Sequence, residues 1–257
     1  MSTNKKNNSY SVILPTFNEV GHIKNLIETI SKIFEKKEIL FEIIVVDDNS
    51  SDGTINEVES IKSVNKSVNL IIRKNKKSSL VASLNEGIVF SKYENIIWLD
   101  ADFSHPPKYI EEFINYKRNV KNIDLIIFSR FLQQSLRYYK VDNTKAVTID
   151  YLSIILNKLC NFFLLKNFSD FTSGYICIKK ECIKNYSLKG YYGDYFINLI
   201  VDCYLKNRSI MELPFLEQKR ASGVSKTTLN KIDFAVKCYF YIIALINNKI
   251  KLFKNKN

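Results

Sequence analysis

The stretch that decides the fold is Ile96-Ile97-Trp98-Leu99-Asp100-Ala101-Asp102. Four apolar residues in a row are typical of a buried strand, and two carboxylates separated by one residue follow directly. Such a pair repels itself and resists desolvation unless a cation or tight hydrogen bonds compensate. A divalent ion that also holds a diphosphate would compensate for this repulsion, because Mg²⁺ and Mn²⁺ prefer carboxylate and phosphate oxygens. We therefore predict that Asp100 and Asp102 bind Mg²⁺ or Mn²⁺.

Strands and helices alternate regularly around this stretch. Apolar runs predict strands at residues 11–14, 41–46, 70–72, 96–99 and 125–128. Helical spacing of apolar residues predicts helices at residues 19–34, 52–61, 79–90 and 108–116. This order indicates an α/β fold with a Rossmann-like, mostly parallel central sheet and helices on both faces. In such folds ligands bind beyond the carboxyl ends of the strands.

The second half of the chain is less regular. Its predicted elements are a loop at 131–143, a helix at 146–165, a strand at 171–178, a helix at 195–205, a strand at 210–215, a loop at 218–229 and an amphipathic helix at 232–250. We find no internal repeat and no linker rich in Pro, Gly or Ser. We therefore predict one catalytic domain over residues 1–230. The amphipathic helix in residues 231–257 would pack on that domain or on a membrane surface.

Four polar clusters begin where predicted strands end, at residues 15–19, 47–54, 100–102 and 129–130. Parallel strands end at a common edge, so we expect the clusters to converge. In the second cluster, Asp48 can accept a hydrogen bond from a base or a ribose. Asp52 is expected to cap the following helix, but the adjacent Asp47 and Asp48 exceed what capping needs. Glu19 is expected to contact a nucleotide, and the alternative is that it simply occupies a favourable place in the first helical turn.

Composition excludes several classes of protein. The chain has 257 residues, 46% of them hydrophobic, and a net charge of +12, which together indicate a folded, basic protein. Either nucleic acid, acidic lipid or a compositional bias explains the charge, but no basic stretch interleaves with aromatic residues as in single-strand binders. The seven glycines form neither G-x-G-x-x-G nor a P-loop, so a dinucleotide dehydrogenase is excluded.

The expected location is the cytoplasm. The five cysteines show no Cys-x-x-Cys spacing, and we expect them to be reduced thiols. The polar N-terminus lacks the apolar stretch of a signal peptide. The apolar run at 238–246 is shorter than the roughly 20 residues of a spanning helix. Lysines near both ends could still hold the protein on the inner face of a membrane.

Several motifs, in order from about residue 11 to 226, resemble glycosyltransferase family 2 with its GT-A fold. Those of the superfamily lie at residues 12–19, 45–54 and 100–107. The second reads Val45-Val46-Asp47-Asp48-Asn49-Ser50-Ser51-Asp52-Gly53-Thr54. Motifs similar to those of the dolichol- or polyprenyl-phosphate mannose synthases lie at 129–131, 170–175, 212–215 and 220–226. The resemblance implies transfer of a mannose- or glucose-type sugar from a GDP- or UDP-linked donor to a polyprenyl phosphate.

The resemblance also implies roles for individual donor-site residues. Pro15, Phe17 and Glu19 would frame the nucleoside, and Asp48 would contact the base or ribose. Asp100 and Asp102 would hold the metal-bound diphosphate of the donor, Asp102 as part of the catalytic machinery. One departure concerns the metal, because Ser104 stands where the family usually has Gln.

The implied acceptor site is less complete. Arg130, Arg220 and Lys226 would act in catalysis by neutralising phosphates, a task that suits Arg and Lys. Arg220, Ser225, Lys226 and Ser153 would bind the acceptor phosphate. The basic residue expected on the helix of Ser153 is replaced by Ile154, although Asn157 fits the pattern. Substitutes for it are Arg137, Lys145 and Lys158.

The expected mechanism is inverting and metal-dependent. A polyprenyl phosphate is already ionised at neutral pH, so its attack needs no strong general base. The alternative is a family 2 enzyme that adds a sugar to a hydroxyl of a cell-surface glycan, for which Asp170 or Asp194 would serve as base. A non-catalytic binding module leaves the acidic loops unexplained.

Overall fold

The computed structural model describes residues 8–74, 76–120, 122–132, 148–218 and 231–255. The chain divides into two compact units, which we describe separately. The first comprises residues 1–125, 175–187 and 217–223, and the second comprises residues 126–174, 188–216 and 224–257.

The sheet of the first unit has the strand order β3-β2-β1-β4-β6. Its strands are β1 (Ser9–Thr16), β2 (Leu40–Asp47), β3 (Val68–Ile72), β4 (Asn95–Trp98) and β6 (Ile176–Lys179). The first four are parallel, and β6 runs antiparallel to β4. The apolar runs form these strands because both faces of the sheet are covered. The predicted mostly parallel sheet is confirmed.

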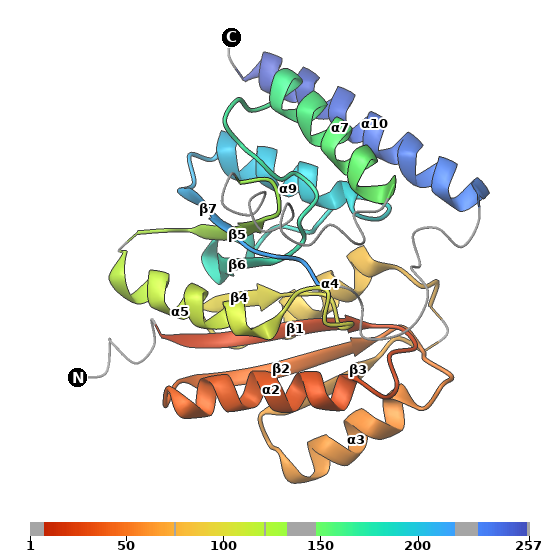
Figure 1. Ribbon diagram of the computed structural model, residues 1–257, viewed down its shortest axis with the longest axis vertical. Coiled ribbons are helices and arrows are strands. Elements are labelled where there is room, and N and C mark those ends of the chain that lie inside the picture. Colours follow the sequence, from red (N-terminus) through yellow and green to blue (C-terminus); the bar gives the residue numbers. More distant parts are fainter. Residues whose placement is uncertain (1–7, 75, 121, 133–147, 219–230, 256–257) are drawn as a thin grey trace. The chain divides into compact units, whose positions relative to one another are not determined.

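Helices cover both faces of this sheet (Figure 1). The helix α2 (Ile23–Lys36) contacts α3 (Thr54–Val64), α5 (Ile110–Asn119) and the 3₁₀ turn η1 (Pro107–Tyr109) in one layer. The helix α4 (Leu80–Phe90) packs on β1 and β2 from the other face. A Cβ atom on Gly87 of α4 would lie 2.5 Å from Cγ2 of Ile13, so the helix needs glycine there. The short helix α8 (Lys180–Ile183) follows β6.

Among its described residues, the second unit has three longer helices and two strands. Its elements are β5 (Leu125–Ser129), α7 (Thr148–Phe163), α9 (Asp194–Leu205), β7 (Ile210–Pro214) and α10 (Lys231–Lys254). The strands β5 and β7 are neighbours, and α10 packs on α9 and contacts α7. The ring of Tyr191 stacks on Phe240 of α10 at 4.5 Å. Within the described residues, no helix is both long and apolar enough to span a membrane.

Two predicted elements begin several residues later in the structure than expected, and left-handed residues explain both. The helix predicted from Glu19 begins only at Ile23, because Asn18 and Gly21 adopt positive φ angles of 55° and 89°. The strand predicted from residue 171 begins at Ile176, after Gly174 with a φ of 70°. Glu19 therefore lies in a loop before the helix rather than in its first turn.

Candidate active site

Three of the polar clusters start at one edge of the first unit's sheet. In the parallel register Thr16 pairs with Asp47, and Asp47 pairs with Ile72. Trp98 of β4 pairs with Ile13 of β1, so both strands end close together. The loops after β1, β2 and β4 therefore begin side by side, as predicted from the parallel sheet.

Asp48, the first residue after β2, is buried and has several partners. Its carboxylate accepts hydrogen bonds from the guanidinium of Arg73, from Oγ of Ser78 at 2.9 Å and from the backbone N of Ser79 at 2.8 Å. Arg73 also binds Glu86, with 3.1 Å between Nε and Oε1. The ion pair of Asp48 and Arg73 thus joins the ends of β2 and β3 to the start of α4.

Sequence reasoning missed Arg73. The residue follows β3 directly, at the same edge as the other clusters. Extending the strand-end rule to every predicted strand would have identified it.

Neighbouring Asp47 and Asp52 hold the two loops together. Asp47 accepts from Oγ1 of Thr16 at 2.9 Å and from the backbone N of Ser50 at 2.7 Å. Asp52 accepts from the backbone N of Thr54 and of Val20, both at 3.0 Å. Burial favours a higher pKa for Asp52, but these donors bring its pKa below the usual value. These carboxylates fix the loop geometry around Asp48.

The three residues predicted to frame a nucleoside lie in the loop after β1. Pro15 is half-buried, and the ring of Phe17 is 37% exposed. Glu19 is buried, and its Oε2 lies 2.8 Å from Nε2 of His22. The backbone N of Glu19 donates to Oγ1 of Thr54 at 2.8 Å. Phe17 thus offers an exposed aromatic ring beside the buried Asp48 loop.

The loop after β4 is held in one conformation by contacts on both sides. Oδ1 of Asp102 accepts from the backbone N of Ser104 at 3.0 Å, and the backbone N of Asp100 donates to Nδ1 of His105 at 3.0 Å. The His105 ring stacks on Tyr175 at 5.0 Å. Phe103, which lies between Asp102 and Ser104 in this loop, has a φ of 65°, a value that is rare and strained for a bulky residue. Backbone strain of this kind is typical of functional loops.

The donor set of this loop fits a hard divalent cation. Asp100 is half-buried and Asp102 buried, and their oxygens are the ligands that Mg²⁺ or Mn²⁺ takes. Among the described residues, no third His, Cys, Asp or Glu ligand atom joins them within 4.8 Å. An ion held here would therefore take its remaining ligands from water and phosphate oxygens, as Mg²⁺ usually does.

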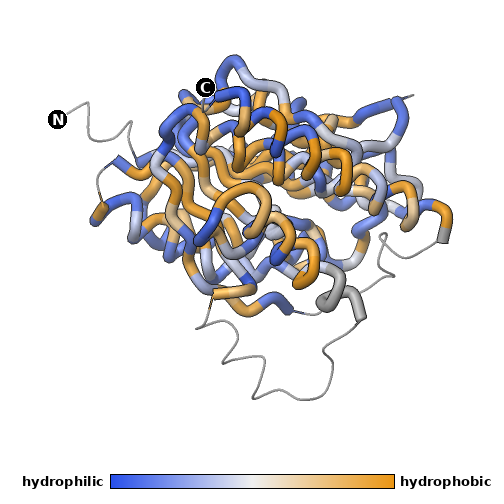
Figure 2. The backbone as a smooth tube through the Cα atoms, turned by 90° about the horizontal axis from the view of Figure 1, so that it is seen from above, coloured by the Kyte–Doolittle hydropathy of each residue, from blue (hydrophilic) through white to orange (hydrophobic). Residues whose placement is uncertain are grey.

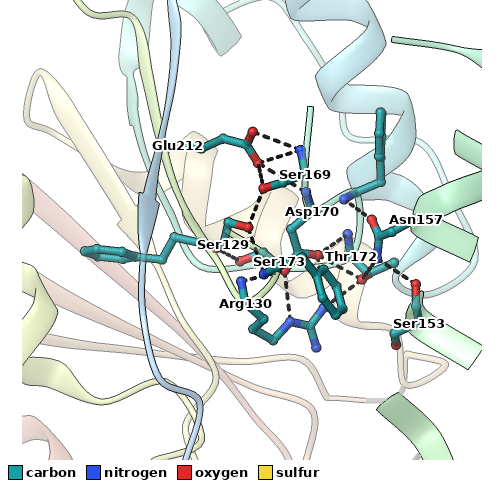
Figure 3. Close-up of polar contacts among 12 residues, drawn as sticks. Ser129, Arg130, Ser153, Asn157, Ser169, Asp170, Thr172, Ser173 and Glu212 are labelled. Atoms are coloured by element: carbon teal, nitrogen blue, oxygen red, sulfur yellow. Dashed lines mark hydrogen bonds and ion pairs between the residues drawn. The ribbon is translucent and has the colours of Figure 1, made fainter. Parts of the chain in front are cut away.

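The second unit carries a separate polar cluster around Arg130 and Asp170 (Figure 3). Nε of Arg130 lies 2.9 Å from Oδ2 of Asp170, and Nη2 lies 3.1 Å from Oδ1. Nη2 also donates to Oγ1 of Thr172 at 2.6 Å. Burial favours a higher pKa for Asp170, but the Arg130 charge and N–H donors hold its pKa below the usual value. The guanidinium is therefore oriented by a bidentate pair.

Asn157 ties α7 to this cluster. Its Oδ1 accepts from the backbone N of Phe171 at 2.5 Å, and its Nδ2 donates to Thr172 Oγ1 at 3.0 Å and to the Ser153 carbonyl at 2.8 Å. Ser153, a predicted acceptor residue, is half-buried one turn before Asn157. The structure brings Ser153 and Arg130 into one network through Asn157 and Thr172 (Figure 3).

Two further carboxylates of this unit are engaged by backbone donors. Glu212 accepts from the backbone N of Ser169 and of Asp170, at 2.9 and 3.1 Å, and burial raises its pKa. Asp194 accepts from the backbone N of Tyr191 and of Tyr192, at 2.9 and 2.7 Å. Asp194 thereby stabilises the start of α9.

Some predicted residues lie outside the part of the chain that the structure describes. These are Arg220, Ser225 and Lys226, and the substitutes Arg137 and Lys145. Their roles stay predictions. The roles proposed for Pro15, Phe17, Glu19, Asp48, Asp100, Asp102, Arg130 and Ser153 also stay predictions, although their positions are now known.

Comparison with known proteins identifies a protein family that this chain matches. The model of glycosyl transferase family 2 matches residues 11–187. Dolichol-phosphate mannosyltransferase of Pyrococcus furiosus is 27% identical over 84% of this chain and 58% of its own length. The corresponding enzyme of Saccharomyces cerevisiae is 34% identical over 39% of this chain and 38% of its own length. The chain thus spans less than two thirds of the length of each of these two relatives.

Solved structures share the fold. Glucosyl-3-phosphoglycerate synthase from Mycobacterium tuberculosis, solved with Mn²⁺, uridine diphosphate and phosphoglyceric acid, matches with a TM-score of 0.67 and 16% identity. The match covers 94% of this chain and 78% of that one. A structure of the same protein with Mg²⁺ and uridine diphosphate gives a TM-score of 0.66, also at 16% identity, over 94% of this chain and 79% of that one. The predicted GT-A fold is confirmed.

Proposed function

Because the chain belongs to glycosyl transferase family 2, we propose that this glycosyltransferase moves a mannose- or glucose-type sugar from a nucleoside diphosphate sugar to a polyprenyl phosphate. In this reaction a phosphate oxygen of the acceptor attacks the anomeric carbon from the face opposite the leaving group. The bond from that carbon to the diphosphate breaks, so the configuration inverts. The likeness to dolichol-phosphate mannosyltransferases supports the choice of acceptor.

The donor would occupy the edge where the loops of the first unit begin. Phe17 would pack against the nucleoside, and Asp48, oriented by Arg73, would accept a hydrogen bond from the base or ribose. Asp100 and Asp102 would hold Mg²⁺ or Mn²⁺, which would neutralise the departing diphosphate. The metal-bound structures of the same fold support this cofactor.

The observation that carries the choice of a phosphate acceptor concerns the two candidate general bases. A hydroxyl acceptor needs a carboxylate to take its proton. Asp170 is fully buried, and the ion pair with Arg130 lowers its pKa, which makes it a weak base. Asp194 is buried and occupied by two backbone N–H groups. A phosphate acceptor needs no such base, and Arg130 and Ser153 would help to bind it.

The test supplies acceptors of both kinds. Purified protein with Mn²⁺ is incubated with GDP-mannose or UDP-glucose and either a short polyprenyl phosphate or a soluble sugar acceptor. We expect a glycosyl phosphate lipid with inverted anomeric configuration, and none after EDTA. Product that appears only with the hydroxyl acceptor would contradict the proposal.

A lipid acceptor also implies a place for the enzyme. We propose that it works in the cytoplasm, on the inner face of the membrane, where a nucleotide sugar and a polyprenyl phosphate headgroup can meet. Nucleic acid has no part in this proposal.

A further inference from the structure

The helix α10 shows apolar residues on its exposed side. Six of them are between 49% and 72% exposed and recur at intervals of seven, three, four, four and three positions, which places them along one side of the helix. They are Ile232, Tyr239, Ile242, Ile246, Ile250 and Phe253. We call these six residues the α10 stripe.

The opposite side of α10 is the one that packs inside the second unit. Ala244, Asn248 and Leu252 are buried there, and Nδ2 of Asn248 donates to Oδ1 of Asn198 on α9 at 2.6 Å. Lys237 is buried too, with its Nζ 4.4 Å from the centre of the Tyr192 ring. The helix α10 thus meets α9 through Ala244, Leu252 and the hydrogen bond of Asn248, and it shows a row of apolar residues on its outward side. A contiguous row of exposed apolar side chains is typical of a surface that a partner or a membrane covers.

The neighbouring helix α7 also carries exposed apolar residues. On α7, which contacts α10, Ile155, Leu159 and Phe162 are exposed at intervals of four and three, and Phe163 adjoins them. Apolar residues, drawn in orange, recur along the helices in Figure 2. The start of α10 also borders an open apolar depression of about 430 Å³, lined by Ile232, Ala235, Val236 and Tyr239.

The charges on α10 indicate what covers the stripe. The helix has five lysines and one acidic residue, Asp233, whose Oδ2 lies 2.6 Å from Nζ of Lys237. Two exposed lysines lie beside the stripe, Lys249 three positions after Ile246 and Lys254 four positions after Ile250. Lysine stems can lie along an apolar surface while their charges reach anionic headgroups. A second copy of this chain would instead bring like-charged lysines together.

We propose that the α10 stripe, with the exposed residues of α7, rests on an anionic lipid bilayer. The apolar side chains enter the boundary between headgroups and acyl chains, and Lys249 and Lys254 pair with lipid phosphates. The inference adds a membrane-binding surface to the proposed function, and its biological role rests on that function.

The test is flotation with vesicles of phosphatidylcholine, with or without phosphatidylglycerol. We expect the protein to float with the anionic vesicles. Ile246→Glu/Ile250→Glu should weaken binding by at least about tenfold, because it sets two carboxylates in the stripe. The matched control Val64→Glu/Val89→Glu makes the same charge change at two residues that are each 85% exposed on α3 and α4, and it should bind like wild type. Circular dichroism checks that both variants fold.

A second variant isolates the charge. Lys249→Gln/Lys254→Gln should lower affinity for anionic vesicles by about fivefold per lysine and leave any binding to neutral vesicles unchanged. Equal flotation of wild type and Ile246→Glu/Ile250→Glu would overturn the proposal. So would a dimer in light scattering that Ile246→Glu/Ile250→Glu abolishes, without vesicle binding by either protein. Activity on a short soluble acceptor is read in parallel, so failed docking is distinguished from failure of the proposed reaction.

Discussion

Acidic side chains at strand ends were predictable one by one, whereas their partners were not. Asp48, Asp100 and Asp102 follow apolar strands, and that pattern is visible in the sequence. The position of Arg73 at a strand end is also visible in the sequence, but its bond to Asp48 and the bond of Thr172 to Arg130 became apparent only in the structure. A hydrogen bond between residues 25 or 42 positions apart depends on how loops fold back, which no local pattern encodes.

Replacing Arg73 with methionine should strongly destabilise the first unit. The side chains of Arg73 and Asp48, which form an ion pair, are both almost fully buried. The substitution therefore leaves the Asp48 carboxylate buried without its cationic partner. Losing one partner of such a pair costs about 3–5 kcal/mol. Urea denaturation measures the loss, and Arg118→Met at an exposed site should change stability by no more than about 0.5 kcal/mol. If Arg73→Met/Asp48→Asn is no more stable than Arg73→Met, the stranded charge is not the cause.

Asp102→Asn should remove nucleotide binding that depends on metal while the loop keeps its shape. The amide retains the oxygen that accepts from the backbone N of Ser104 but lacks the charge that a cation needs. In thermal unfolding with Mn²⁺ and UDP or GDP, wild type should gain about 2.7 kcal/mol at a hundredfold excess over Kd. Asp233→Asn, which changes an acid paired with Lys237 on α10, should behave like wild type. An unchanged Mn²⁺-dependent shift in Asp102→Asn would reject the metal assignment.

Asp170 should make the second unit sensitive to acid. Its pKa is lower in the folded protein than the ordinary 3.8, so the unfolded chain binds the proton first. The stability from this carboxylate is complete above about pH 4 and is lost as the pH falls through the lower folded pKa. The stability gap between wild type and Asp170→Asn should therefore be widest near pH 7 and narrow below pH 4, as measured by urea titration.

Glu212 provides a control of opposite sign. Its pKa is raised in the folded protein above the ordinary 4.5, so its contribution is most favourable below that pH and declines as the pH rises through the folded value. The gap between wild type and Glu212→Gln should change in the opposite direction over that range. Parallel profiles for the two variants would contradict the assigned shifts.

At the scale of elements, periodicity predicted most helices and strands, and turns caused the errors. The intervals in α2 matched a buried helical face at Ile23, Leu26, Ile27, Ile30 and Ile33. The boundaries failed where a residue adopts a left-handed conformation, as at Asn18 and Gly174. Apolar spacing is blind to such residues, because asparagine and glycine are also common elsewhere in loops.

Gly87→Ala should destabilise the packing of α4 on β1. Alanine is intrinsically better than glycine in a helix by up to about 1 kcal/mol. Its Cβ would nevertheless lie 2.5 Å from Cγ2 of Ile13, which is fully buried, and overpacking costs about 1–3 kcal/mol. Chemical denaturation should show a net loss, and the effects of Gly87→Ala and Ile13→Ala should be less than additive. A more stable Gly87→Ala would show that the strand can shift away.

At the scale of the molecule, the two proposals together predict how activity depends on the acceptor. With a long-chain acceptor in anionic vesicles, Ile246→Glu/Ile250→Glu should lower the rate by about tenfold, because the enzyme is concentrated less on the surface. With a short soluble polyprenyl phosphate, its rate should equal that of wild type. Equal losses on both acceptors would mean that the substitutions damage the catalytic unit rather than docking.

The antiparallel strand β6 affects how the protein is made. It pairs with β4, yet 77 residues of chain separate the end of β4 at Trp98 from the start of β6 at Ile176. A ribosome that has delivered only the first 125 residues has released β4 with that edge open. Open edges invite pairing with other chains. The nascent polypeptide is therefore most prone to aggregate in the interval before Lys179 emerges, and a chaperone that shields the β4 edge during synthesis should raise the yield of native enzyme.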